Sequence, residues 1–428
     1  MPRKRSDKRP AAFVDVQSPG TIHEKDTGEV VMDAGRTKLV RAFTNSVERC
    51  VSVGAPTKRF RLVANKDGRI VSAFGPIVVM SADLAFPGCT NAEQITEADM
   101  ALDRADATRG NSPSGRALDW AIRKNPQLRQ WRTTTQMMEV FASSLYGGIQ
   151  FGGERKPRPK PGLLNIDVCS SYPYMATAPL PRIRDAVIER GLRPHATLVR
   201  IAGNQYEQAL FTRLPNGNTH YAEDIFGWYS ADEVDYHISM GRLRVQTVMQ
   251  SCTFPHSEKY LLPAVNHFFD AREKYARGTP QRNVIKSALN GLLGKFASPI
   301  STWRTPTPIE LQYAKLSRKT STIELGLSSL IDDRSLANIY PRHSNVVWTA
   351  VTYARARIRL WQKMDEIRAA GGKVLWCHTD CIIAEVPQSY RMVSGTALGD
   401  WRIVEQSPYP LTTEQGKQCP MQGKTPAW

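Results

Sequence analysis

Acidic residues are scarce in this sequence relative to basic ones. Asp and Glu total 40 residues against 57 Lys and Arg, so the 428-residue chain carries a formal net charge of +17. Such an excess of positive charge is typical of proteins with a polyanionic partner, usually nucleic acid. Composition leaves one alternative open, a basic protein with no such partner. The length suggests two or three domains.

Cysteines are few and unevenly placed, and long apolar runs are missing. The seven cysteines are scattered and odd in number, and none forms a Cys-x-x-Cys pair. This pattern argues against a zinc site and favours reduced thiols. We therefore expect an intracellular protein, in a bacterial or host cytoplasm. No run approaches the about 20 apolar residues that span a bilayer, so we expect no membrane partner.

The sequence divides into three zones. Residues 1–115 are mixed in character and carry short strand-like runs, such as Arg59–Val63 and Ile77–Met80. Residues 116–162 form a connector, because Ser114–Ser144 is predicted to be helical and two glycines follow it. A basic, Pro-rich loop then contains Arg155 and Lys156. This loop either follows a phosphate backbone or is simply solvated.

Residues 163–428 alternate strand and helix patterns. An apolar strand is predicted at Leu163–Ile166. Apolar residues recur at helical spacing in Asn283–Phe296 and Val347–Arg368. Two apolar runs, Val374–Cys377 and Cys381–Ala384, flank His-Thr-Asp and predict a β-hairpin.

Two aspartates lie at the ends of these apolar strands. Asp167 follows the first strand directly, and Asp380 lies at the tip of the predicted hairpin. Each alone is consistent with an ordinary turn aspartate. If a hairpin tip lies beside the strand end, however, the two carboxylates share a site and need a cation. Hard oxygen ligands favour Mg²⁺ or Mn²⁺, and two such ions can support phosphoryl transfer.

A third feature is a basic helix face. Arg282, Lys286 and Asn290 are four residues apart and share one face, while the other face is apolar. Such a face can hold a triphosphate, because phosphoryl transfer depends mainly on positioning and charge neutralisation. A solvated basic face is the alternative.

These three features resemble, in the same order, the motifs of family-B DNA polymerases. The DxxSLYP motif A resembles the stretch Asp167–Pro173, which reads DVCSSYP. The KxxxNSxYG motif B resembles Lys286–Gly294, which reads KSALNGLLG. The YxDTDS motif C resembles Trp376–Cys381, which reads WCHTDC.

Further matches favour the protein-primed branch of this family, found in phages and linear plasmids. The YxGG segment ahead of motif A resembles Ser144–Gly148, and an LGxW motif resembles Leu398–Trp401. A KxY motif resembles Gly416–Cys419, with Cys in place of Tyr. Weakly patterned segments at about 185–260 and 300–340 lie where this branch carries insertions.

The resemblance implies a role for individual residues. Asp167, Asp380 and the backbone carbonyl of Val168 would ligate two catalytic Mg²⁺ or Mn²⁺ ions. The incoming deoxynucleoside triphosphate would be held by Lys274, Arg282 and Lys286, with Tyr172 under the sugar and Asn290 near the nascent base pair. Template and primer DNA would be contacted by Tyr146, Gly147, Gly148, Arg155, Lys156 and Lys417.

The resemblance also implies a fold. We expect an α+β protein with an antiparallel palm sheet, short helical fingers and an N-terminal α/β domain at residues 1–115. Palm and fingers would occupy residues 163–428. We expect no 3′–5′ exonuclease, because Asp15-Val-Gln17 lacks the second acid of a DxE motif, and a thumb that is absent or minimal.

The function implied is DNA-directed DNA synthesis for a phage, virus or linear plasmid, primed by an oligonucleotide or by a terminal protein. His378 departs from the family pattern by replacing the first Asp of motif C, which weakens metal binding relative to a carboxylate. Leu293 replaces the tyrosine of motif B. Two alternatives remain: a non-catalytic, DNA-binding accessory protein, and a template-independent or protein-nucleotidylating transferase.

Overall fold

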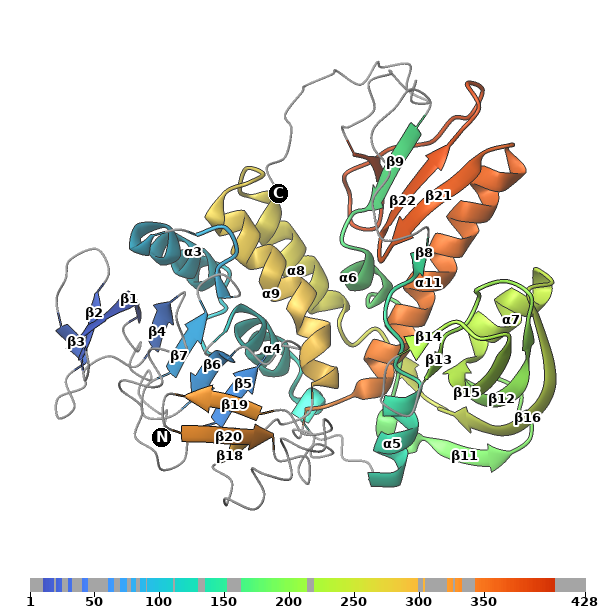
Figure 1. The fold of residues 1–428 in the computed structure, drawn as a ribbon, viewed down its shortest axis with the longest axis horizontal. Helices are drawn as coiled ribbons and strands as arrows, with labels where there is room; N and C mark the ends of the chain where they lie inside the picture. Colours follow the sequence, from blue (N-terminus) through green and yellow to red (C-terminus); the bar gives the residue numbers. More distant parts are fainter. Residues whose placement is uncertain are drawn as a thin grey trace. The chain divides into compact units, whose positions relative to one another are not determined.

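The computed structural model divides into two compact units, each built from two separate segments of the chain (Figure 1). The first unit comprises Met1–Gln130 and Asn266–Ser344, and the second comprises Trp131–Val265 and Asn345–Trp428. In the division expected from the sequence, the helix around Lys286 belongs to residues 163–428. In the structure it groups with the N-terminal residues. The structure describes residues 11–18, 21–24, 30–32, 41–44, 61–64, 70–74, 78–81, 85–89, 91–110, 112–129, 135–151, 163–213, 219–298, 303–304, 322–325, 328–332 and 343–404.

A mixed seven-stranded sheet lies in the N-terminal part of the first unit. Its strand order is β3-β2-β1-β4-β7-β6-β5. Strand β4 runs parallel to both β1 and β7, while the remaining pairs are antiparallel. The two strand-like runs expected from the sequence correspond to β5 and β7. The strands are β1 Ala11–Ser18, β2 Thr21–Glu24, β3 Val30–Met32, β4 Arg41–Thr44, β5 Arg61–Ala64, β6 Ile70–Phe74 and β7 Val78–Ser81.

Helix α9 packs against α3 and α4 in the first unit. Thr279 caps its first turn and Pro280 occupies the first helical position, where a proline costs no hydrogen bond. The predicted apolar face is buried, and Lys286 and Asn290 are exposed. The helices are α3 Ala92–Arg104, α4 Pro113–Lys124, α8 Leu262–Glu273 and α9 Pro280–Ala297, and a small sheet contains β18 Trp303–Arg304, β19 Thr322–Leu325 and β20 Ser328–Asp332.

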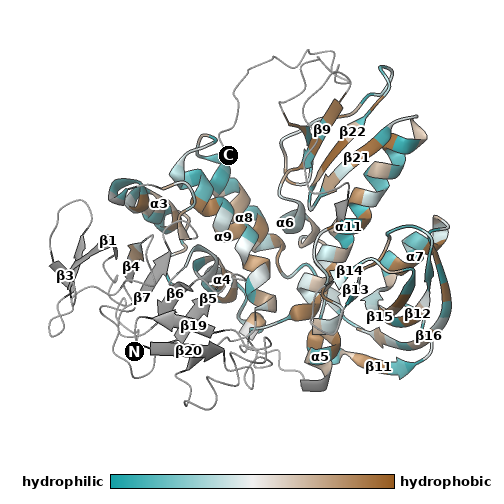
Figure 2. Cartoon of the chain, viewed as in Figure 1, coloured by the Kyte–Doolittle hydropathy of each residue, from teal (hydrophilic) through white to brown (hydrophobic). Residues whose placement is uncertain are grey.

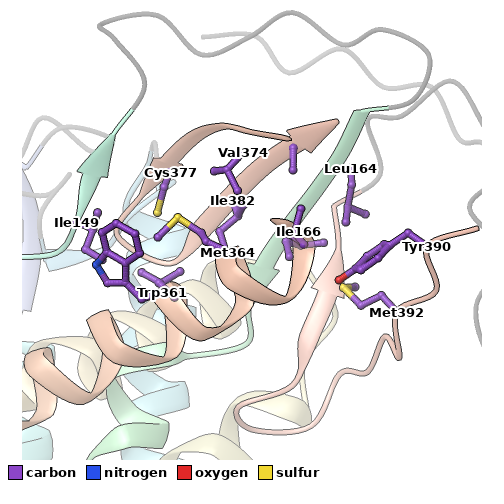
Figure 3. Packing of buried hydrophobic residues seen from close by; sticks show 13 residues of the cluster. Ile149, Leu164, Ile166, Trp361, Met364, Val374, Cys377, Ile382, Tyr390 and Met392 are labelled. Atoms are coloured by element: carbon purple, nitrogen blue, oxygen red, sulfur yellow. The ribbon is translucent and has the colours of Figure 1, made fainter. Parts of the chain in front are cut away.

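The second unit contains a five-stranded antiparallel sheet covered on one face by helix α11. Figure 3 shows Trp361 and Met364 of the helix beside Ile382 and Cys377 of the strands. Each fully buried aliphatic side chain contributes roughly 1.5–3 kcal/mol. In sheet order the strands are β23 Trp401–Ile403, β9 Leu163–Val168, β22 Cys381–Glu385, β21 Lys373–His378 and β8 Gln150–Phe151, and α11 is Val346–Ala369.

A second antiparallel sheet, β11-β16-β12-β15, lies within residues 185–260 together with helix α7. Its sequence pattern is weak because Gly203 and Gln205 occupy inward positions of β12. The Gln205 side chain is buried and accepts hydrogen bonds from the backbone N–H groups of Ala209 and Leu210. The elements of this region are α6 Ser171–Met175, β10 Leu180–Pro181, η2 Ile183–Asp185, β11 Val187–Arg190, β12 Leu198–Gln205, β13 Thr212–Arg213, β14 Thr219–His220, β15 Asp224–Ser230, α7 Ala231–Ser239, β16 Leu243–Thr253 and β17 Ser257–Glu258.

The single helix expected over Ser114–Ser144 is instead interrupted. Helix α4 ends at Lys124, a 3₁₀ turn η1 spans Pro126–Arg129, and α5 spans Thr135–Ser143. A proline at position 126 disfavours the helical conformation at the residue before it, which ends α4.

Surface and core differ clearly in polarity along the longest helix. Figure 2 shows both apolar and polar stretches on α11, and its buried residues include Trp348, Val351 and Leu360. None of the helices that the structure describes is both long and apolar enough to cross a membrane.

Candidate active site

Strand pairing brings the backbones of the two predicted aspartates together, with Asp167 on β9 and Asp380 in the turn between β21 and β22. Asp167 is the fifth residue of β9, and its register partner on β22 is Cys381, the residue after Asp380. The backbone N–H of Val168 donates to the carbonyl oxygen of Asp380 at 3.0 Å. Two aspartates more than 200 residues apart in sequence therefore lie at the same end of one antiparallel sheet.

Arg402 is a residue of this site that the sequence did not point to. It pairs with Asp167 in the β23–β9 register, and its guanidinium forms an ion pair with Oδ2 of Asp167. Both side chains are partly exposed, at 33% and 18%. The Asp167 carboxylate is therefore held by a cation of the protein itself.

The turn that carries Asp380 is strained. Thr379 has a φ of 61°, which is rare for a β-branched residue. The backbone N–H of Asp380 donates to the carbonyl of His378 at 2.7 Å, a three-residue γ-turn. Such strain persists only where surrounding contacts hold it, and it is concentrated at functional sites.

The donor set at this end of the sheet fits a magnesium-type ion that also binds its substrate. Asp167 and Asp380 offer carboxylate oxygens, the ligands that Mg²⁺ and Mn²⁺ prefer. Among the described residues, no group of three or more His, Cys, Asp or Glu side chains is arranged as a metal cage. Magnesium commonly binds through one or two carboxylates plus substrate phosphates, so a pair of carboxylates suffices.

Tyr172 lies on α6 beside this end of the sheet. Its ring stacks on Tyr353 of α11 with centroids 4.2 Å apart, and burial raises the pKa of its hydroxyl. A Cβ atom added to Gly148 would lie 2.8 Å from the Tyr172 hydroxyl and 3.0 Å from the Cα of Thr379. Gly148 thus allows close packing between the tyrosine and the strained turn.

Tyr146 does not have the exposure expected of a DNA contact. Its side chain is 3% exposed and stacks on Tyr229 at 5.2 Å. The ring belongs to the core of the second sheet, because an aromatic side chain gains more from such packing than from water. Gly147 is exposed and Gly148 partly exposed, so the glycines are the accessible part of this segment.

The residues predicted to hold a triphosphate belong to the first unit, as does Asn290. Their side chains differ in exposure. Lys274, Lys286 and Asn290 are exposed. Arg282 instead donates to the carbonyls of Arg272 and Tyr275 at 3.2 and 2.9 Å and pairs with Glu273 at 2.7 Å. Its guanidinium therefore caps the C-terminal end of α8.

Two aspartates in the N-terminal part of the chain have a structural role. Asp99 and Asp103 of α3 both form ion pairs with Arg116 of α4, a side chain only 2% exposed. Asp15 lies on β1. Arg155, Lys156 and Lys417 lie outside the described residues.

Arg357 is a buried arginine that the sequence did not point to. Arg355, Arg357 and Arg359 alternate along α11, and residues two apart cannot share a helix face. On a helix packed against a sheet, at least one of them must therefore face inward. This spacing was a sequence signal for a buried arginine. Arg357 is the buried one, at 2% exposure.

Searches against protein-family models and against curated proteins gave no match. Among solved structures, the chain is similar to Phi29 DNA polymerase complexed with primer-template DNA and incoming nucleotide substrates. The identity is 12%, the TM-score is 0.59, and the match covers 85% of this chain and 76% of that one. The complex of Phi29 DNA polymerase with single-stranded DNA gives 12% identity and a TM-score of 0.58, over 85% and 75% of the two chains. The chain therefore shares the fold of Phi29 DNA polymerase.

Proposed function

We propose that this chain is a DNA-directed DNA polymerase that transfers deoxynucleotides to a primer 3′-hydroxyl or to a protein hydroxyl. One observation carries the proposal. Asp167, in the motif A-like stretch, lies on β9, and Asp380, in the motif C-like stretch, lies in the adjoining β21–β22 turn, whose backbone is hydrogen-bonded to Val168. The likeness to a polymerase fold that has been solved with primer-template DNA supports the same activity.

The residues of the site have separable tasks in this proposal. Asp167, Asp380 and the Val168 carbonyl would hold Mg²⁺ or Mn²⁺, which when bound supplies charge neutralisation and activation of the attacking hydroxyl. Lys274 and Lys286 would bind the triphosphate oxygens through charge-assisted hydrogen bonds.

Tyr172 and the DNA-binding residues complete the proposed arrangement. The Tyr172 ring is fixed by its stacking on Tyr353, so it offers a rigid surface to the sugar and would exclude a 2′-hydroxyl. Gly147 and Gly148 would approach the DNA backbone closely, and Lys417 would contact the primer strand. The protein primer would be the partner of a phage, virus or linear-plasmid replication system.

The test is extension of a labelled DNA primer on a template with Mg²⁺ and four deoxynucleotides. Asp380→Asn should lower kcat by about 100-fold or more, since a bound metal ion contributes several kcal/mol to the transition state. Asp224→Asn, at an exposed position of β15, is the matched control and should behave as the wild type. Equal extension by wild type and Asp380→Asn would refute this assignment of the site.

A second candidate, a non-catalytic DNA-binding protein, is favoured by the Arg402–Asp167 ion pair. A protein cation on that carboxylate can replace a metal ion, because it neutralises the same charge. Binding of Mn²⁺ to the wild type, followed by electron paramagnetic resonance, separates the two. Tight DNA binding without Mn²⁺ binding or extension would favour the non-catalytic protein.

Extension in the absence of a template would instead identify a template-independent transferase, and labelling of a protein hydroxyl would identify a protein-nucleotidylating one. Both reactions use the same two carboxylates, so the same Asp380→Asn variant is the control.

A further inference from the structure

A short segment, Tyr146–Ile149, connects helix α5 to strand β8 and contacts the turn that carries Asp380. We call it the glycine strap. At its C-terminal end, the carbonyl of Ile149 accepts a hydrogen bond from the backbone N–H of Thr379 at 2.8 Å. Beside this bond, Gly148 lies so close to Thr379 that a Cβ atom would be 3.2 Å from the threonine Cβ. The strap therefore contacts the strained residue through both a hydrogen bond and direct packing.

At its N-terminal end, the glycine strap is held by Arg357. Nη1 of this arginine donates to the carbonyls of Tyr146 and Gly147 at 2.9 and 2.8 Å. The bond to Tyr146 is buried and the bond to Gly147 is partly buried, and away from water a hydrogen bond from a charged donor is strengthened.

The guanidinium of Arg357 is in turn fixed by Glu233. Nε and Nη2 donate to the two carboxylate oxygens of Glu233 at 2.6 and 2.7 Å, and the side chains are 3% and 1% exposed. Burial alone lowers the pKa of Arg357, but the Glu233 carboxylate more than offsets this, so the pKa is raised. The guanidinium therefore stays charged, and its bidentate bonds to Glu233 set the direction of Nη1.

We propose that Glu233 and Arg357 are positioning residues for Asp380. The ion pair fixes the glycine strap, and the strap holds Thr379 at its positive φ and so sets the direction of the following carboxylate. The inference rests on the proposed function only in the role given to Asp380. Glu233 belongs to α7, within the segment 185–260. In this proposal the segment therefore supports the turn that carries Asp380.

The first readout is hydrogen exchange at the Thr379 amide in the full chain, without metal or DNA. Glu233→Ala should speed this exchange about 10-fold or more, because Arg357 then loses its partner and the strap loosens. Glu233→Gln should restore most of the protection, since its amide oxygen still accepts from the guanidinium. The second readout is Mn²⁺ binding without DNA, which Glu233→Ala should weaken about threefold or more.

Asp365→Asn is the matched control. Asp365 of α11 pairs with Arg242, another buried arginine, and accepts from the Tyr236 hydroxyl at 2.5 Å. Within the part of the chain that the structure describes, no hydrogen bond or ion pair joins these groups to the strap. It should lower Tm while leaving the Thr379 amide as protected as in the wild type.

The inference is overturned if Thr379 exchange is unchanged in Glu233→Ala, or if Asp365→Asn speeds it equally. Should Glu233→Ala fail to fold, Arg357→Lys provides the same test, since an ammonium cannot reproduce the guanidinium's four hydrogen bonds. Failure of the proposed function would show differently, as a wild type that neither binds Mn²⁺ nor extends a primer, while the exchange result still decides the role of the strap.

Discussion

At the scale of single residues, the site depends on close packing around a glycine. Gly148 contacts both the Tyr172 hydroxyl and Thr379, whereas a Cβ atom on its neighbour Gly147 would meet nothing within 4 Å. Two adjacent glycines of one motif therefore have different reasons to be glycine. Gly148 is required because a side chain there would clash with Tyr172 and Thr379. At Gly147 there is room for a side chain or a ligand atom.

This difference predicts opposite results for two alanine substitutions. Gly148→Ala should destabilise the second unit by about 1–3 kcal/mol, because the new methyl group displaces Tyr172 or the Thr379 backbone. Gly147→Ala should change stability by less than about 0.5 kcal/mol. Urea unfolding followed by circular dichroism measures both, and an equal loss in the two variants would contradict the packing argument.

The two aspartates were the part of the site that could be predicted from the sequence. Asp167 and Asp380 were placed on adjoining elements because apolar strands flank them. Arg402 was not found, since an arginine in sequence has the same appearance whether it is solvated or paired. Arg357 was missed although its position between Arg355 and Arg359 on one helix was a signal. The partners of these arginines, Asp167 and Glu233, come from other parts of the chain, and pairings over such distances are not encoded in local pattern.

At the scale of elements, the helices with a 3.6-residue apolar period were predicted within a few residues. The structure has α9 at Pro280–Ala297 and α11 at Val346–Ala369, around the predicted ranges. The second sheet was not predicted, because buried polar and glycine positions in β12 remove the alternation that identifies a strand. The break between α4 and α5 was missed although Pro126 marks it.

Helix α9 carries one cation that is paired within the protein, Arg282, and one that is exposed, Lys286. Arg282→Ala should lower the stability of the first unit by about 1–3 kcal/mol, because the carbonyls of Arg272 and Tyr275 lose a donor and Glu273 is left with Arg272. Lys286→Ala should leave Tm nearly unchanged, since its ammonium is exposed, and raise the KM for deoxynucleotides by about 10-fold through loss of a phosphate contact. Steady-state primer extension and thermal unfolding of both variants provide the comparison.

If Lys286→Ala leaves KM unchanged while Lys274→Ala raises it, the triphosphate is bound by the other exposed lysine. An unchanged KM in both variants would contradict the triphosphate role of this helix.

At the scale of the whole molecule, the second unit has a built-in sensitivity to acid. His237 of α7 is fully buried, and neither ring nitrogen has a hydrogen-bond partner in the described part of the chain. Burial, together with Arg242 and Arg357, lowers the pKa of His237 to about 3. The imidazole is therefore neutral in the folded state, whereas it takes up a proton below about pH 6.5 in the unfolded chain.

Because the unfolded state binds the extra proton, stability should fall as the pH drops from about 6.5 toward 3. The expected slope from His237 is about 1.4 kcal/mol per pH unit. Urea unfolding of the wild type at pH 7, 6 and 5 should show this loss, and His237→Phe should flatten it. The exposed His220 is the control, because His220→Gln should keep the wild-type slope. A His237→Phe slope equal to that of the wild type would contradict the assignment.

The pairing of β9 with β22 has a consequence for biosynthesis. More than 200 residues separate these strands, so at about 5–20 residues per second the ribosome delivers the second one roughly 10–40 s after the first. Until then, Leu163, Leu164 and Ile166 of β9 are not paired with β22. An unpaired apolar strand of this kind is prone to aggregate. Translation speed and chaperone supply should therefore limit how much of this protein reaches its folded form.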